Sequence, residues 1–107
     1  MRAAILILAL SFAGSALAAG NPEKGKAKAA QVCAACHGAD GAKPVAPENP
    51  ILAGQYADYL AKALADYKSG KRANPVMKAF ADQLSRQDME DLAAWFAGQK
   101  SSLHFQR

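Results

Sequence analysis

Residues that favour β-strands are few in this 107-residue chain, and those that are β-branched are scattered rather than arranged in an alternating run. A strand needs such a run of about four to eight residues, so a sheet protein is not expected. The chain also lacks a glycine-rich phosphate-binding motif and is too short for a Rossmann or barrel enzyme. What remains is one small domain. Its alanine-rich core supplies limited folding free energy, so a further stabilising cross-link or bound group is expected.

The charge balance excludes an obvious nucleic-acid binder. The chain has thirteen basic and nine acidic residues, and it contains no basic stripe interleaved with aromatic residues. Lys24, Lys26 and Lys28 alternate in a probable helix, which is typical of a solvated face, although such lysines can also steer an acidic partner protein.

The N-terminus has the pattern of an export signal. A positive start at Arg2 is followed by the apolar run 3–13, and Ala16-Leu17-Ala18 fits the small-x-small cleavage rule. A retained anchor is the alternative, but the uncharged stretch is at the short limit for a membrane span. We therefore predict a Sec-type signal peptide over 1–18, a mature domain over 19–107, a periplasmic location and no membrane insertion after cleavage.

Helix signals dominate the mature part. Asn21 is a potential N-cap with Pro22 at the first helical position, which predicts a helix to about Ala35. Glycines and prolines then predict a loop, before a second helix over 55–69 that ends at Gly70. A short helical piece to residue 84 and a last helix opened by the capping box of Ser85 and Asp88 complete an all-α domain.

The motif that carries chemistry is Cys33-Ala34-Ala35-Cys36-His37. A C-x-x-C-H run is the attachment sequence of c-type haem, because both thiols can reach the haem vinyl groups while the adjacent histidine lies under the iron. Three other interpretations compete: a redox-active disulfide, half of a zinc site, and a structural disulfide. A redox disulfide would need a thioredoxin-like strand pattern and a zinc site a second ligand pair, and neither is present. A structural disulfide across so short a loop would add little stability.

A second axial ligand has three candidates in the mature chain, Met77, Met89 and His104. Met89 lies on the apolar face of the last helix, where core packing explains it, and His104 lies in an exposed-looking tail. Met77 follows Asn74-Pro75 in a segment with no helical face that demands a methionine, so it is the predicted thioether ligand.

The sequence resembles class I cytochromes c, the small monohaem kind of bacterial periplasms, and one domain of the related dihaem cytochromes. The resemblance covers nearly the whole mature chain and rests on Gly25, residues 33–38, 50–55, 59–60, 68–72 and 74–77, Leu84-Ser85 and residues 92–95. It implies an all-α class I fold, with three to five helices around one covalently attached haem c. An aromatic residue that many relatives carry four positions before the first cysteine is replaced by Ala29.

The resemblance also implies roles for individual residues. Cys33 and Cys36 would bond the haem, and His37 and Met77 would be the axial ligands of its iron. The Pro50 carbonyl would accept a hydrogen bond from His37, and Leu52 would line the haem pocket. Arg72 is a weaker candidate for a contact with a haem propionate. Gly25 would let the first and last helices cross closely, with Trp95 packed at the crossing.

These roles predict a soluble electron carrier rather than an enzyme, because two axial ligands leave no open site for substrate. Its partners are expected to be redox proteins that dock weakly, with the carrier itself a monomer or a weakly associating protein. Two alternatives stay open: a haem protein that binds a small ligand or reacts with peroxide, and a cytochrome subunit of a larger redox enzyme.

Overall fold

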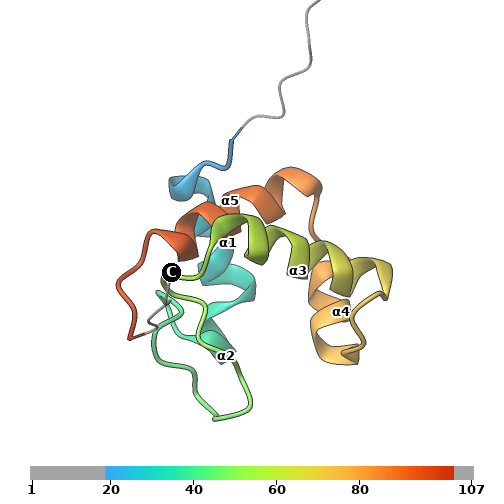
Figure 1. The fold of residues 1–107 in the computed structure, drawn as a ribbon, viewed down its shortest axis with the longest axis horizontal. Helices are drawn as coiled ribbons and strands as arrows, with labels where there is room; N and C mark the ends of the chain where they lie inside the picture. The colour runs from blue at the N-terminus through green and yellow to red at the C-terminus, as the bar shows by residue number, and fades with distance from the viewer. Residues whose placement is uncertain (1–18, 103–107) are drawn as a thin grey trace, which may run out of the picture.

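The computed structural model describes residues 19–102, and every regular element within them is a helix (Figure 1). The helices are α1 (Pro22–Val32), α2 (Ala34–His37), α3 (Ala57–Ser69), α4 (Pro75–Ala81) and α5 (Arg86–Ala97). The predicted all-α class is confirmed. The predicted signal peptide, 1–18, lies outside the described residues, and among those described no helix is both long and apolar enough to cross a membrane.

Helix α1 begins as predicted and ends earlier than predicted. The Asn21 side chain accepts hydrogen bonds from the first-turn amides, and Pro22 occupies the first turn. The helix ends at Val32 instead of continuing to Ala35, because the chain turns at Cys33. The Cys33 carbonyl then accepts from the amides of Cys36 and His37, which starts the separate short helix α2.

Helix α3 ends where the sequence predicts. Gly70 has φ 84°, the left-handed conformation that glycine adopts without strain, and closes the helix. The helix starts at Ala57, two residues after the predicted Gln55. Leu60 and Tyr67, both on the predicted apolar stripe, are buried.

The α1–α5 crossing is so close that only glycine fits at its centre. A Cβ atom on Gly25 would lie 1.9 Å from the carbonyl oxygen of Asp91 and 2.9 Å from the Cβ of Trp95. The expected crossing of Gly25 and Trp95 is therefore present. The buried Asp91 carboxylate reinforces it by accepting the Asn21 amide at 2.7 Å, and the Lys26 ammonium lies 5.5 Å from the centre of the Trp95 ring.

The core lies where α5 meets α1 and α3. Its buried members are all apolar: Ala29, Leu60, Leu84, Met89, Leu92, Ala93 and Phe96. Helix α5 packs on α1 and α3, and α3 packs in turn on α4. Helix α4 therefore lies at the end of the domain that is remote from α1 (Figure 1). Helix α2 and the loop 38–56 project on the same side as α4.

The capping box at the start of α5 makes domain stability depend on pH. The Asp88 carboxylate accepts the Ser85 amide at 2.9 Å, and the Ser85 hydroxyl accepts the Asp88 amide at 3.0 Å. The hydrogen bond from the Ser85 amide, helped by Lys28 at 3.7 Å, lowers the pKa of Asp88. A lowered carboxyl pKa adds stability above its unfolded-state value, near 4, and that stability is lost as the pH falls through the folded-state value.

Replacing Asp88 by asparagine is therefore expected to destabilise the haem-loaded protein by about 0.5–1 kcal/mol at pH 7. The difference from the unmodified protein should shrink as the pH falls through the folded-state pKa of Asp88 and vanish where both side chains are uncharged. Thermal unfolding followed by circular dichroism across this pH range measures it. Ser85→Ala is the contrast, because the hydrogen bond from the Asp88 amide to the Ser85 hydroxyl does not titrate, so a cost should remain in acid; a D88N deficit that persists in acid would contradict the charge argument.

Candidate haem-binding site

A cavity of about 710 Å³ opens between α2, the loop 38–56 and helices α3, α4 and α5. Its volume lies within the range of about 300–1,000 Å³ that small-molecule and cofactor sites occupy. The walls are mainly apolar, and their large apolar side chains are Val32, Ile51, Leu52, Tyr59, Leu60, Leu64, Tyr67, Val76, Phe80, Leu84, Leu92 and Phe96, besides Met77. Four potential haem-binding side chains line the same cavity: Cys33, Cys36, His37 and Met77.

His37 is fixed by the loop that follows it. The imidazole is 7% exposed, and its Nδ1 lies 2.9 Å from the carbonyl oxygen of Pro50. A carbonyl can only accept, so Nδ1 carries the proton and Nε2 is left with a free lone pair. The hydrogen bond that the family resemblance implied between these residues is present, and it sets the tautomer that a metal ligand needs.

The two cysteines form no disulfide bond, and both are half-buried. Burial raises the pKa of the Cys33 thiol to about 11. Redox-active C-x-x-C motifs have the opposite property, a lowered pKa of about 3.5–7.5 at the attacking thiol. Within residues 19–102 no three His, Cys, Asp or Glu side chains gather as a metal site, so the zinc interpretation finds no donor set there.

The structure separates the two methionine candidates. Met77 is half-buried on α4 and lines the cavity, and its amide donates to the Asn74 side chain at 3.0 Å. Met89 is 5% exposed and belongs to the core cluster, away from the lining of this cavity. The third candidate, His104, lies outside the described residues.

The remaining predicted wall residues also lie at the cavity. Leu52 lines it, and its amide donates to the Gly41 carbonyl at 2.9 Å, which closes the loop on itself. Arg72 lines it as well, with its guanidinium carbon 4.8 Å from the centre of the Tyr67 ring. Stacking on an aromatic face holds a guanidinium in place without neutralising its charge.

Asn49 is a supporting residue that the sequence did not single out. Its side-chain amide donates to the Cys36 carbonyl at 3.2 Å, and the Val45 amide donates to the same oxygen at 3.0 Å. These bonds tie the end of α2 to the loop that carries Pro50. A residue in an irregular loop has no periodicity, so only its position beside Pro50 could have drawn attention to it.

Comparison with known proteins identifies the family to which this chain belongs. The family described as cytochrome c oxidase, cbb3-type, subunit III matches residues 20–96. Cytochrome c4 of Pseudomonas aeruginosa is 52% identical over 98 residues, which are 92% of this chain and 48% of that protein. Cytochrome c-554(548) of Halomonas halodenitrificans is 39% identical over 71 residues, which are 64% of this chain and 84% of that protein.

A solved structure supports the same family assignment. The crystal structure of reduced recombinant cytochrome c4 from Pseudomonas stutzeri superposes with a TM-score of 0.72 at 45% identity, covering 79% of this chain and 48% of that one. The chain thus spans about half the length of the cytochrome c4 relatives that it matches. By its all-α fold and the match over residues 20–96, the chain belongs to the class I cytochrome c family and carries covalently bound haem c.

Proposed function

We propose that this chain is a periplasmic electron-transfer protein, made with the signal peptide 1–18 and folded as a cytochrome c domain over 19–107. The observation that carries the proposal is the lining of the cavity, where Cys33, Cys36, His37 and Met77 come together among apolar walls. When bound, the haem supplies a one-electron iron couple. The polypeptide supplies the attachment, the axial ligands and a dry environment, which together tune the reduction potential.

We assign the covalent bonds to Cys33 and Cys36 and one axial position to His37. The bond from Nδ1 to the Pro50 carbonyl orients the ring and raises the basicity of Nε2 as a ligand. Asn49 supports this indirectly by holding α2 on the same loop. The apolar wall at Leu52 excludes water from that side of the cavity.

The second axial position is assigned to Met77, whose thioether on α4 is a soft ligand suited to a closed, electron-transferring iron. Arg72 is assigned to a haem propionate. The support for Arg72 is electrostatic, because among the described residues it is the only lysine or arginine that lines the cavity, and its side chain is already held against Tyr67.

An iron with both axial positions filled offers no place for a substrate, which supports a carrier rather than an enzyme. Its partners would be redox proteins that dock on a small surface of this domain and then dissociate. The domain would work in the same way as a free carrier, as a subunit of a redox enzyme or as part of a longer protein.

The test of this proposal is Met77→Ala, made in a host that attaches c-type haem. The oxidised, unmodified protein should show the weak far-red band of sulfur-to-iron ligation. M77A should lose that band, keep its covalent haem and have a reduction potential lower by on the order of 0.2 V, because a thioether favours the reduced iron. Met89→Ala is the matched control and should keep the band; a band that survives in M77A would overturn the assignment.

A further inference from the structure

Helix α4 carries Met77 but is weakly anchored by apolar contacts. It is seven residues long, too short to be stable alone in water. Ala81 is its only buried residue, while Val76 and Phe80, which are 62% and 36% exposed, line the cavity, where bound haem would cover them. The apolar side chains of α4 thus lie mainly at the cavity rather than against α3, so polar contacts between the two helices contribute to holding α4 in place.

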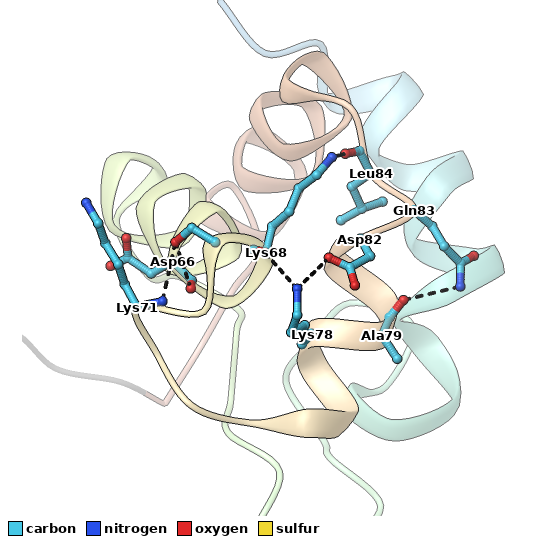
Figure 2. Close-up of polar contacts among 9 residues, drawn as sticks. Asp66, Lys68, Lys71, Lys78, Ala79, Asp82, Gln83 and Leu84 are labelled. Carbon is cyan, nitrogen blue, oxygen red and sulfur yellow. Dashed lines mark hydrogen bonds and ion pairs between the residues drawn. The ribbon is translucent and has the colours of Figure 1, made fainter.

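Lys78, the residue after Met77, supplies one such contact. Its ammonium donates to the backbone carbonyl of Lys68 at 2.9 Å and to the Asp82 carboxylate at 3.0 Å (Figure 2). Lys68 lies in the last turn of α3, where carbonyls have no partner within the helix and the helix dipole is negative. A cation placed there is both a hydrogen-bond donor and a favourable charge.

Lys68 makes the reciprocal contact. Its ammonium donates to the carbonyl of Leu84 at 2.5 Å, in the link between α4 and α5 (Figure 2). The two side chains thus run in opposite directions. Lys78 reaches from α4 to the end of α3, and Lys68 reaches from α3 to the chain just beyond α4.

We propose that Lys68 and Lys78, here called the lysine pair, are positioning residues that keep α4 on α3 and so keep the Met77 thioether at the cavity. The inference rests on the proposed function, since it takes Met77 to be the axial ligand. Without the lysine pair, α4 leaves α3 more often while the rest of the domain stays folded. Short, poorly buried segments open locally in this way.

The experiment measures how often the methionine position is open, by titrating imidazole into the oxidised, haem-loaded protein. Imidazole can take that position only when Met77 has left, so its apparent affinity scales with the open fraction. Lys78→Met keeps the length of the side chain and removes its two hydrogen bonds. We expect imidazole to bind K78M about tenfold more tightly than the unmodified protein, with Lys68→Met changing in the same direction.

Lys71→Met is the matched control for lost surface charge. Lys71 follows α3 by two residues, and within the described chain only its backbone amide has a hydrogen bond, to the Ser69 hydroxyl at 3.4 Å (Figure 2). K71M should bind imidazole within about twofold of the unmodified protein. The thermal unfolding midpoints of K78M and K71M should agree within a few degrees, because the opening is local.

The outcomes separate the two proposals. Equal imidazole affinities in K78M and K71M, with a far-red band that depends on Met77, would overturn the role of the lysine pair and leave the ligand assignment intact. A tighter affinity in K78M that is matched by a large fall in its unfolding midpoint would also overturn it, since the effect would then be global. A far-red band that does not depend on Met77 would overturn both.

Discussion

Replacing Cys33 and Cys36 together by alanine is expected to abolish covalent haem attachment completely. Each thioether needs one cysteine sulfur, and the chain has no other cysteine. His37 and the apolar walls of the cavity would remain, so the variant could still hold haem loosely. The measurement is extraction of the denatured protein with acidified solvent, followed by mass spectrometry. The unmodified protein should keep its haem mass on the polypeptide, and the double variant should keep none.

Met77→Ala is the control for this experiment, because it removes a ligand from the same cavity while leaving both thiols. It should keep its haem through extraction. Haem that stays on the double variant would contradict the attachment at Cys33 and Cys36, and haem lost from both variants would point to a folding defect instead. The comparison therefore separates covalent attachment from axial ligation, two roles that the family resemblance assigns together.

The same double variant is expected to be much less stable than the unmodified protein. Among residues 19–102, Leu92 is the largest fully buried side chain, and four of the ten buried apolar residues are alanines. Such a core gains little free energy on its own. The apolar walls of the cavity need the bound haem to cover them, and a covalent link keeps the haem there when the chain opens.

The sequence was most informative where the signal is local. Asn21 before Pro22, Gly70 after α3, and Ser85 paired with Asp88 each depend on residues at most three positions apart, and each is found as predicted. These signals work because the orphan amides and carbonyls at a helix end have few possible partners. The loop 38–56, marked by glycine and proline, is also free of regular elements in the structure.

Part of the site could be predicted because its chemistry is concentrated in one short motif. Cys33, Cys36 and His37 are neighbours in sequence, and all three line one cavity, while their bonds to haem stay a prediction. The hydrogen bond from His37 to Pro50 spans 13 residues, and it could be anticipated only through the resemblance to cytochromes c. Met77 and Met89 differ in sequence only by context, and the structure separates them by placing one at the cavity and the other in the core.

The contacts that the sequence did not reveal are long-range and made by flexible or irregular residues. The bond from Lys68 to Leu84 spans 16 residues, and the bond from Asn49 to Cys36 spans 13. Lys78 stands in no sequence motif that marks it, and it donates to the end of α3. The break between α1 and α2 at Cys33 was missed for a related reason, because helix propensity alone favours continuing through Ala34 and Ala35.

Replacing Gly25 by alanine is expected to cause the largest loss of stability for a single added methyl group. The new Cβ would lie 1.9 Å from the carbonyl oxygen of Asp91 and 2.5 Å from its carbon. Both atoms are backbone, so no rotamer change relieves the overlap and the helices α1 and α5 must separate. Overpacking typically costs about 1–3 kcal/mol, and an overlap with backbone atoms belongs at the upper end of that range. For a domain of this size the thermal unfolding midpoint should fall by about 15 °C.

Gly98→Ala is the matched control, since it adds the same methyl group just beyond the end of α5. Its φ is −80°, which any residue adopts, and the nearest atoms to the new Cβ lie at 3.6 and 3.7 Å. G98A should stay within ~0.5 kcal/mol of the unmodified protein. Both midpoints are measured on haem-loaded protein by circular dichroism; a G25A protein that melts together with G98A would mean that the crossing is not close.

Gly25→Ala should also change the surroundings of the haem, because the two helices that it separates, α1 and α5, both end at the cavity. Helix α1 leads directly into Cys33, and α5 contributes Leu92 and Phe96 to the cavity wall. Since neither thiol is altered, G25A should still attach haem covalently. Its loosened wall should admit water and lower the reduction potential, because a more polar surrounding stabilises the oxidised iron. A potential that stays unchanged despite the lower midpoint would show that α1 and α5 separate without moving the cavity wall.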